Sequence, residues 1–341
     1  MIGINSNGTD TLRVGIVGAG GIANAHLPAW LQLGARVGVY SVHGAPELVA
    51  RHGAGRIVDS LDELLASVDV VDVCTPTYTH PEIVLAAAAA GRHVLCEKPL
   101  ALDAATAQEM VTACDTAGVR LYPGHVVRYF PEYAALQRAV AAGAIGTPAV
   151  LTFHRSGARP RQAWFADPAL SGGIIMDQMI HDLDFARWLG GEVESVHARL
   201  ADSDPGTATG VVSAHVVARH SNGVISSVTG TWARPGTRFR YGFQAAGTDG
   251  MLAYDSAADP SLRTDTGAAP DDGAERLLPD VSLMESPFIT EIREFAAALT
   301  GGPTPRVSAD DGVAAVRLAA AATASLDTGR PEPVELAPAA A

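Results

Sequence analysis

Hydrophobic residues in the first third of the chain fall into short apolar runs with helical stretches between them. Such runs are typical of strands buried on both faces of a parallel sheet. The runs are Leu12–Val17, Ala35–Tyr40, Val68–Val73, His93–Cys96 and the shorter Arg120–Tyr122. Helices are expected up to about Leu33, after the capping box Ser60-Leu61-Asp62-Glu63, over Pro81–Ala90, and over Ala104–Ala117 behind Asp103. This alternation predicts a doubly wound parallel sheet.

The pattern changes after about His125. A helix is expected over Pro131–Ala142, followed by alternating strand-like stretches without helices between them. These stretches are Ala149–His154, Val211–Ala218 and Val224–Thr231, and the late helices are expected over Ser286–Leu299 and Gly312–Ser325. The fold class predicted is α/β, with an N-terminal Rossmann domain over residues 1–128. An α+β domain with an open, largely antiparallel sheet is expected over residues 129–341.

A glycine-rich turn follows the first predicted strand. It has the sequence Gly18-Ala19-Gly20-Gly21-Ile22-Ala23, a G-x-G-x-x-A pattern between a strand and a helix. In this context Gly18 permits a tight turn, Gly20 lets the backbone approach a pyrophosphate, and Ala23 packs the helix on the strand. Gly18, Gly20, Gly21 and Ile22 are therefore predicted to bind a dinucleotide at the helix N-terminus.

The second strand leaves the choice between NAD and NADP open. It ends in Val39-Tyr40-Ser41-Val42-His43, and no acidic residue precedes Glu47. An acid at this point normally binds the ribose hydroxyls of NAD, and an arginine would favour NADP. No arginine lies in the turn, although His43, Arg51 or Arg56 could reach it. Ser41 is predicted to contact the ribose.

Composition narrows the class of protein. The net charge of -13 and a pI near 5.2 argue against nucleic acid and anionic membranes as partners, so a small molecule is expected. No apolar run is long enough to cross a bilayer. The cysteines Cys74, Cys96 and Cys114 have neither disulfide-framework nor metal-site spacing, and are expected to be buried apolar side chains in a cytoplasmic protein.

The two ends of the sequence are expected to lie outside the folded domains. Met1–Thr11 lacks the features of a signal peptide and predicts a frayed leader. Glu332–Ala341 resembles a Pro/Ala tail.

A lysine stands where the fifth strand ends. Glu97-Lys98-Pro99 follows His93–Cys96, and the carboxyl ends of strands in open α/β sheets border the ligand crevice. Lys98 there could polarise a hydroxyl or a carbonyl. The alternative is a local ion pair with Glu97.

The stretch from Ser171 to Trp188 has helical periodicity and carries acid/base residues. At 100° per residue, Asp177, His181 and Asp184 lie within roughly 60° of one another, while Asp182 points away. A carboxylate one turn from an imidazole can orient the ring for general acid/base catalysis. The alternatives are an ordinary surface pair or a metal site, but no third ligand is evident and no metal is predicted.

Substrate recognition is less specific in the sequence. The most basic stretch, His154 to Trp164, is expected to be a loop before this helix and contains three arginines and an indole. Arginine and tryptophan can bind a hydroxylated ring, a carboxylate or a phosphate. His154, Arg159 and Trp164 are therefore candidate substrate-binding residues, with solvated arginines or dimer contacts as the alternative.

Taken together and in this order, these motifs resemble the Gfo/Idh/MocA family, related to glucose-fructose oxidoreductase and inositol dehydrogenase. The resemblance covers about residues 12 to 330 and includes Thr75-Pro76-Thr77 with His80. It implies reversible hydride transfer between a nicotinamide cofactor and a secondary alcohol of a sugar, inositol or related polyol. It also implies that the C-terminal sheet walls the substrate site and forms a homodimer or homotetramer.

The resemblance assigns roles residue by residue. It implies that Lys98 hydrogen-bonds the reacting oxygen, that Asp177 binds substrate and that His181 is the catalytic acid/base. The residues that match cofactor-side positions are Thr75, Pro76, His80 and Glu97. Lys98 is also expected to contact the cofactor. Arg128 also matches the family and is expected at the substrate, whereas Val126 replaces a frequent asparagine. Relatives often hold the Lys98–Pro99 bond cis.

Two other functions occur in this family. Some members cleave glycosidic bonds through transient oxidation by bound NAD, and some are nucleotide-sensing regulators that have lost the reactive residues. The presence of Lys98, Asp177 and His181 favours a dehydrogenase.

Overall fold

The computed structural model describes residues 11–204, 210–257 and 285–335. Its described residues belong to two compact units. One comprises Met1–Leu100, Gln108–Gly124 and Glu285–Ala309, and the other comprises Ala101–Ala107, His125–Met284 and Asp310–Ala341. The predicted single boundary after residue 128 does not describe these units, because the chain returns to the first unit near its end. Most of the predicted leader, and residues 336–341 of the predicted tail, lie outside the described residues.

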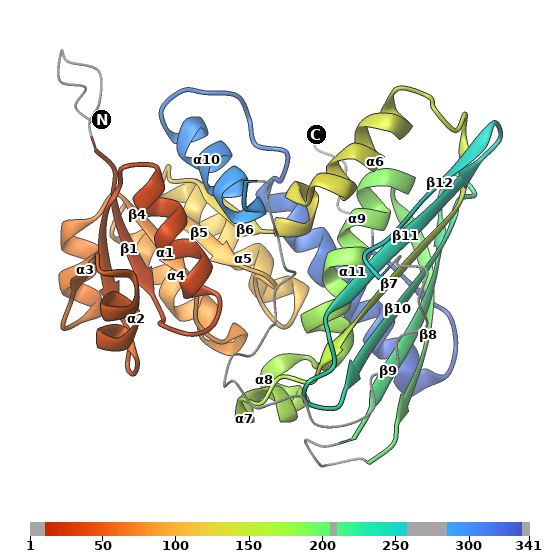
Figure 1. Cartoon of the computed structure of the whole chain (residues 1–341), viewed down its shortest axis with the longest axis horizontal. Helices are drawn as coiled ribbons and strands as arrows, with labels where there is room; N and C mark the ends of the chain where they lie inside the picture. Colours follow the sequence, from red (N-terminus) through yellow and green to blue (C-terminus); the bar gives the residue numbers. More distant parts are fainter. Residues whose placement is uncertain (1–10, 205–209, 258–284, 336–341) are drawn as a thin grey trace. The chain divides into compact units, whose positions relative to one another are not determined.

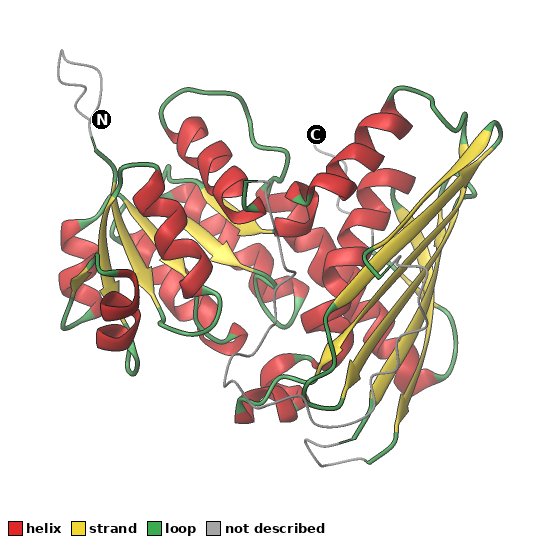
Figure 2. Ribbon diagram, viewed as in Figure 1, coloured by secondary structure: helices red, strands yellow, loops and turns green. Residues whose placement is uncertain are grey.

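The first unit is built on a six-stranded parallel sheet (Figures 1 and 2). The strand order is β3-β2-β1-β4-β5-β6, which is the doubly wound order predicted for a Rossmann fold. The strands are β1 (Arg13–Val17), β2 (Arg36–Tyr40), β3 (Arg56–Ile57), β4 (Val70–Val73), β5 (His93–Glu97) and β6 (Leu121–Gly124). Because all pairs are parallel, the carboxyl ends of the strands share one edge.

Helices connect these strands, and one arrives from far along the sequence. The connecting elements are α1 (Ala23–Gln32), α2 (Ala45–His52), α3 (Leu61–Ser67), η1 (Thr77–Thr79), α4 (His80–Ala89) and α5 (Ala104–Thr116). The capping box is confirmed, since Ser60 accepts a hydrogen bond from the Glu63 N–H. The late helix α10 (Pro287–Leu299) packs on α1, with the Phe288 and His26 rings 5.5 Å apart. This packing brings residues 285–309 into the first unit.

The second unit contains a seven-stranded sheet in the order β12-β11-β7-β10-β9-β8-β13. Its strands are β7 (Pro148–Ala158), β8 (Val193–Asp202), β9 (Val212–His220), β10 (Ile225–Ala233), β11 (Arg240–Gly247), β12 (Gly250–Asp255) and β13 (Glu332–Pro333). Every pair is antiparallel except β7 with β10, which confirms the largely antiparallel sheet. The first residues of the predicted tail thus form a strand.

The helical elements of the second unit include the segment that carries the predicted catalytic histidine. They are η2 (Val126–Tyr129), α6 (Pro131–Ala141), α7 (Ala163–Ala166), α8 (Pro168–Ser171), the π-helical turn η3 (Ile175–Met179), α9 (Ile180–Gly190) and α11 (Ala309–Thr328).

One face of the second sheet packs on helices and the other is exposed. On the packed face, Tyr133 of α6 and Phe185 of α9 both contact the ring of Phe153 from β7. On the opposite face, Val150 and Ile225 are paired across β7 and β10 and are each 47% exposed. The alternation along each strand therefore separates an aromatic core from an open surface.

No helix among the described residues is both long enough and apolar enough to span a membrane.

Candidate functional site

The glycine turn of the first unit has the geometry of a phosphate cradle. Gly18 has φ +101° and donates its N–H to the Tyr40 carbonyl at 2.8 Å. A Cβ on Gly18 would lie 2.6 Å from the Cys74 carbonyl oxygen, so only glycine fits, whereas a Cβ on Gly20 would meet nothing within 4 Å. No side chain caps α1 at Ile22. An uncapped helix N-terminus beside open space at Gly20 fits a dinucleotide phosphate.

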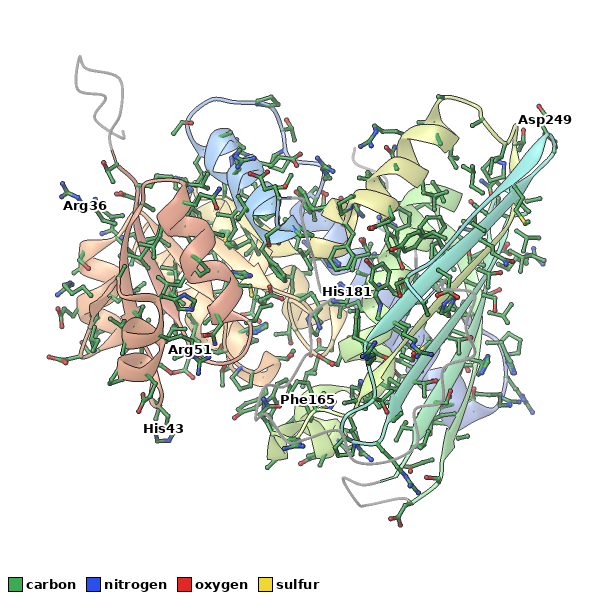
Figure 3. The ribbon with its side chains drawn as sticks, in the orientation of Figure 1. Arg36, His43, Arg51, Phe165, His181 and Asp249 are labelled. Carbon is green, nitrogen blue, oxygen red and sulfur yellow. The ribbon has the colours of Figure 1, made fainter. Side chains whose placement is uncertain are left out.

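The turn after β2 lies beside this cradle. Ser41 Oγ donates to the His43 carbonyl at 2.7 Å, and a Cβ on Gly44 would come within 3.5 Å of the Ala19 carbonyl. His43 is exposed at this turn (Figure 3). Ser41 thus lies near the predicted ribose position.

The two arginines near the turn after β2 already have partners. Arg51 donates to Asn24 at 2.9 Å, and Arg56 donates to Glu63 at 2.9 Å. These contacts do not direct either guanidinium toward the position expected for the 2'-phosphate of NADP.

The turns after β4 and β5 are joined by a buried histidine. His80 is 1% exposed, its Nδ1 lies 2.9 Å from the Pro99 carbonyl oxygen, and its Nε2 lies 2.9 Å from the Thr75 carbonyl oxygen. Burial lowers the pKa of His80, against the opposing effect of the two carbonyl acceptors. Thr79 Oγ1 lies 2.8 Å from Thr75 Oγ1 and 2.7 Å from the Pro76 carbonyl, which further fixes the predicted cofactor-side turn. The contacts of His80 are therefore structural.

Lys98 follows β5 directly and is the only lysine in the 341-residue sequence. Its peptide bond to Pro99 is cis, as the family resemblance implies. Its backbone N–H donates to Glu97 Oε2 at 3.2 Å. Glu97 is only 6% exposed, and its Oε1 lies 3.0 Å from His26 Nε2. The carboxylate therefore faces the core of the unit, although Glu97 was predicted on the cofactor side.

Three buried acids surround one imidazole in this unit. We call His26, Asp72, Glu97 and Glu291 the His26 cluster. His26 Nδ1 lies 2.9 Å from Asp72 Oδ2, and Trp30 Nε1 donates to the same oxygen at 2.7 Å. Glu291 is fully buried, and neither of its carboxylate oxygens has a hydrogen-bond partner among the described residues.

Burial and the neighbouring charges together make the His26 cluster retain protons. Burial raises the pKa of Glu291 well above its ordinary value, and the neighbouring charge of Glu97 raises it further. Burial opposes the charged form of His26, but attraction to Asp72 outweighs it together with smaller contributions, and the pKa of His26 is raised well above 6.5. The structure thus favours a protonated His26 imidazole, beside Asp72 and Glu97, and a protonated Glu291.

Sequence reasoning missed this cluster, although it leaves two signals. Asp72 interrupts the otherwise apolar β4, where a charge needs a buried partner. Glu291 lies on the apolar stripe of α10 formed by Phe288, Ile292 and Phe295.

His26 and Asp72 of this cluster, together with the neighbouring Cys74, have the composition of a metal site. The ligand atoms of His26, Asp72 and Cys74 lie within 4.8 Å of one another, the single such group in the described chain. All three are buried and already contact one another, with Cys74 Sγ donating to Asp72 Oδ1 at 3.4 Å. Burial raises the pKa of the Cys74 thiol, which disfavours the thiolate that binds metal. Hydrogen bonding accounts for these contacts.

In the second unit, the helix predicted to carry Asp177 and His181 is not uniform. Asp177 lies in the π-helical turn η3, whereas His181 lies in the first turn of α9. A π-turn adds one residue per turn, so the predicted 100° phase does not hold between them. Asp182 does point to another side, where its carboxylate accepts from Arg155 at 2.8 and 2.9 Å and from Tyr133 at 3.0 Å.

A second imidazole lies against His181. The ring of His125 meets the His181 ring edge-on with centroids 6.5 Å apart, and His125 Nδ1 lies 3.6 Å from Asp184 Oδ2. His125 is 1% exposed. The sequence pattern alone indicates no role for this residue, because only the folded chain brings the segment after β6 against α9.

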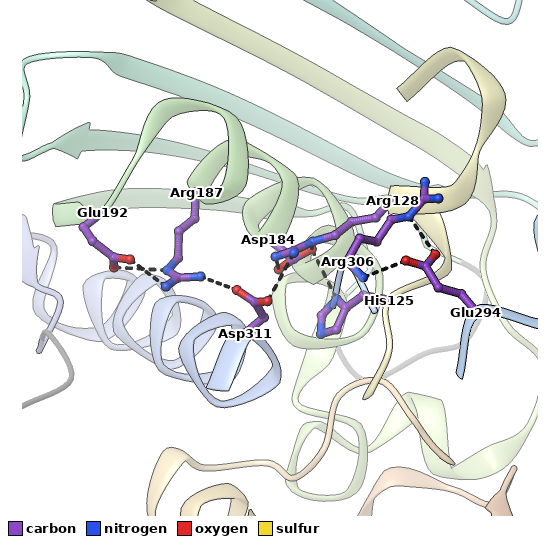
Figure 4. Close-up of polar contacts among 8 residues, drawn as sticks. All are labelled: His125, Arg128, Asp184, Arg187, Glu192, Glu294, Arg306 and Asp311. Atoms are coloured by element: carbon purple, nitrogen blue, oxygen red, sulfur yellow. Dashed lines mark hydrogen bonds and ion pairs between the residues drawn. The ribbon is translucent and has the colours of Figure 1, made fainter. Parts of the chain in front are cut away.

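Arg128 binds carboxylates inside the unit. It donates to Asp184 at 2.6 and 2.7 Å and to Asp311 at 3.2 Å, so each guanidinium nitrogen is engaged. Its guanidinium also lies 4.7 Å from the centre of the Trp188 ring. Burial opposes the charge, but the two carboxylates outweigh it and raise the pKa of Arg128. Figure 4 shows this network, which Arg187 and Glu192 extend beyond Asp311. These contacts hold the Arg128 side chain inside the second unit, and its predicted role at the substrate stays a prediction.

The basic stretch is also placed differently from expectation. Strand β7 continues to Ala158, so residues 154–158 form strand and not loop. Phe153 and Arg155 face α9 and its ion pair, and the alternation turns His154 to the opposite face, where its Nε2 lies 3.9 Å from Asp255 Oδ1. His154 therefore lies on the face opposite α9, beside β12. Arg159 is buried and Trp164 stacks on Phe165 at 3.7 Å; both stay candidates.

Comparison with known proteins agrees with these two units. Residues 12–125 match the oxidoreductase family with an NAD-binding Rossmann fold, and residues 133–253 match the GFO/IDH/MocA C-terminal domain. A myo-inositol 2-dehydrogenase of Thermotoga maritima is 31% identical over 335 residues, covering 94% of this chain and 97% of the relative. A 1,5-anhydro-D-fructose reductase of Ensifer adhaerens is 31% identical over 295 residues, or 83% and 86%.

A solved structure extends the similarity to three dimensions. The crystal structure of GenD2 from gentamicin A biosynthesis, in complex with NAD, has a TM-score of 0.83 to this chain and is 26% identical in sequence. The match covers 98% of this chain and 100% of GenD2. The chain therefore belongs to the Gfo/Idh/MocA family of oxidoreductases, and its first unit is the NAD-binding Rossmann fold of that family.

Proposed function

We propose that this enzyme transfers hydride between NAD and a secondary alcohol of an inositol, a sugar or a related polyol. The observation that carries the proposal is the similarity over 94% of the chain to a protein named myo-inositol 2-dehydrogenase. A second relative is named for an anhydro-sugar. Both names describe polyhydroxylated rings, which supports this substrate class.

The catalytic roles combine one lysine and one histidine. His181 accepts the hydroxyl proton during oxidation and returns it during reduction, as a general base and acid. Lys98 donates a hydrogen bond to the reacting oxygen and stabilises the charge that develops there. Asp177 binds substrate hydroxyls. Bound NAD supplies the hydride acceptor.

The cofactor side uses the cradle described above. Gly18, Gly20, Gly21 and Ile22 hold the pyrophosphate, and Ser41 binds the adenosine ribose. Thr75 and Pro76 border the nicotinamide half. NAD is preferred over NADP, because Arg51 and Arg56 are engaged by Asn24 and Glu63 and no other arginine follows β2 closely.

On the substrate side, Arg159 and Trp164 join Asp177 and His181 as contacts from the second unit. Trp164 is stacked on Phe165, which gives a rigid aromatic surface for the apolar face of a ring. Arg159 supplies hydrogen-bond donors for hydroxyl or carboxylate oxygens.

The test measures reduced nicotinamide by absorbance with NAD and NADP separately. The substrate panel contains inositols, aldoses, uronic acids and keto-sugars. We expect Lys98→Met and His181→Ala each to lower kcat by on the order of 10²–10⁴-fold. Arg36→Met, at an exposed cation of the first unit, is the matched control. Full activity in both catalytic variants would contradict the proposal.

Other outcomes of the same assay identify the alternatives. Release of free sugar without net reduced cofactor indicates a glycosidase that uses NAD transiently. Tight NADH binding with no turnover of any compound indicates a nucleotide-sensing regulator.

We also propose that the exposed face of the second sheet forms a homodimer or part of a homotetramer. Val150, Val217 and Ile225 are 46–47% exposed on neighbouring strands of this face. Thr229 Oγ1 lies 3.1 Å from His215 Nδ1 across β10 and β9 beside them, so the surface is partly polar and partly apolar. A second copy of the chain would bury it.

A further inference from the structure

We propose that Glu97 is a positioning residue for Lys98, held by the buried pair His26–Asp72, and that it makes no contact with the cofactor. This inference rests on the proposed function in so far as Lys98 is catalytic. It gives a role to a buried charge cluster that hydride transfer itself does not require.

The first step is the contact between Glu97 and the lysine turn. Glu97 Oε2 accepts the Lys98 backbone N–H at 3.2 Å. This N–H lies at the point where the chain leaves β5, whose last residue is Glu97. The carboxylate therefore fixes the backbone from which the lysine side chain starts. A backbone rotation at Lys98 would swing its long side chain, and hydrogen bonds to a charged acceptor resist such rotation.

The second step is the hold on Glu97 itself. Its other oxygen, Oε1, lies 3.0 Å from His26 Nε2, and His26 Nδ1 lies 2.9 Å from Asp72 Oδ2. Trp30 Nε1 donates to Asp72 at 2.7 Å. His26 and Asp72 are fully buried, so the surrounding residues restrict the movement of their side chains. The order Asp72, His26, Glu97, Lys98 is thus a continuous chain from strand β4 to the lysine.

The third step is the other side of the turn. His80 Nδ1 lies 2.9 Å from the carbonyl oxygen of Pro99, the residue after Lys98. His80 is anchored through Nε2 to the Thr75 carbonyl of the neighbouring turn. Two buried histidines therefore hold the residues on either side of the lysine, one through the Glu97 carboxylate and one through the Pro99 carbonyl. A turn clamped at both ends presents its side chain in one direction, which is the requirement for a group that must meet a reacting oxygen.

The geometry of Glu97 disfavours a direct role in cofactor binding. Only 6% of the residue is exposed, and both oxygens lie close to groups of its own unit. Removing the carboxylate should therefore disturb Lys98 before it disturbs affinity for NADH.

The single lysine provides a direct readout. Reductive methylation with 13C-formaldehyde labels Lys98 and the α-amino group of the chain, and no other lysine exists to overlap. The Lys98 methyl signal is recorded by NMR for the wild type, Glu97→Leu, Glu97→Gln and Glu97→Asp. Glu109→Gln and Glu109→Leu are matched controls at an exposed glutamate of the same unit.

We expect Glu97→Leu to shift the Lys98 signal and to lower kcat on the order of 10- to 100-fold, as for loss of a charged hydrogen bond. The dissociation constant of NADH should stay within about twofold. Glu97→Gln keeps an acceptor oxygen for the Lys98 N–H and should retain more activity and a more nearly native signal than Glu97→Leu. Lys98→Met combined with Glu97→Leu should be no slower than Lys98→Met alone, because Glu97 acts through the lysine.

The outcomes separate this inference from the proposed function. An unmoved lysine signal with an unchanged rate in Glu97→Leu overturns the positioning role. A weakened NADH affinity with an unmoved lysine signal also overturns it, and makes Glu97 a cofactor contact. If the wild type oxidises no polyol, the proposed function fails, yet the lysine signal still decides the positioning role.

If Glu97→Leu does not fold, the Lys98 methyl signal of Glu97→Asp tests the positioning role instead. Aspartate keeps the charge, but its shorter side chain cannot reach from the Lys98 N–H to His26. The same displaced signal is expected there, and a native signal in this variant overturns the inference.

Discussion

Replacing Glu291 by glutamine should make the stability of the first unit less dependent on pH. Glu291 is fully buried, and its oxygens have no hydrogen-bond partner among the described residues. Burial raises its pKa well above the ordinary value near 4.5, and repulsion from Glu97 adds to this shift. The native state therefore keeps a proton that the unfolded chain releases once the pH exceeds the ordinary carboxyl value.

The sign and size of the effect follow from proton linkage. Because the folded state binds more protons, the stability contributed by protonated Glu291 is complete at low pH. It is lost as the pH rises toward the raised pKa. The slope for one retained proton is about 1.4 kcal/mol per pH unit. Between about pH 6 and pH 8, Glu291→Gln should therefore gain up to about 2.7 kcal/mol over the wild type.

The assay needs a probe of the first unit alone. Trp30 is the one tryptophan of that unit, and its Nε1 bonds to Asp72 of the His26 cluster. The 19F signal of 5-fluorotryptophan at this position, followed during urea unfolding at several pH values, reports the unit. The Glu109→Gln variant serves as an exposed control, and its stability should parallel the wild type.

The comparison between variants isolates Glu291 from His26. The pKa of His26 is raised as well, so its contribution also declines as the pH rises above 6.5. It is present in both proteins and largely cancels in their difference. A difference between wild type and Glu291→Gln that stays constant across this pH range would refute the reasoning, since Glu291 would then carry no proton in the native state.

Three further changes test other parts of the structure. Gly20→Ala should fold normally yet bind NADH at least about tenfold more weakly in a fluorescence titration. Gly18→Ala should lower the urea midpoint, because its Cβ would strike a carbonyl oxygen. Equal behaviour of the two variants would contradict the phosphate-cradle role of this turn. Asp182→Asn should destabilise the second unit by about 3–5 kcal/mol in urea unfolding, because it leaves the buried Arg155 charge unpaired. An unchanged midpoint would refute that role. Val217→Asp should produce monomers in sedimentation velocity, and an unchanged sedimentation coefficient would place any dimer contact elsewhere.

The parallel sheet could be predicted because its determinants are local. Five of the six strands of the first unit coincide with an apolar run, and β3 (Arg56–Ile57), which is exposed, is the exception. The glycine turn and Lys98 were found for the same reason, since a strand followed by a turn defines where both lie. The return of α10 to this unit could not be found in this way. It depends on packing between Phe288 and His26, which are distant in the sequence.

Three site residues have surroundings that the sequence did not predict. Arg128 has the chemistry of a substrate ligand, and its partner Asp311 is 183 residues away. His154 points away from Phe153 because side chains alternate along β7, and the strand continues to Ala158 where a loop was expected. Asp177 lies in a π-helical turn that periodicity treats as regular helix. In each instance the sequence identified the residue type, but not the contacts or the local helix geometry that surround it.

The two units bury charge in ways that respond differently to pH. In the second unit the buried acids Asp182 and Asp184 are paired with arginines, whose charge persists throughout the accessible pH range. In the first unit the buried acids meet an imidazole, and the cluster holds protons that rising pH removes. Alkaline destabilisation should therefore begin in the first unit. The clamp on Lys98 runs through that cluster, so the same deprotonation that weakens the unit would also loosen the turn that carries the lysine.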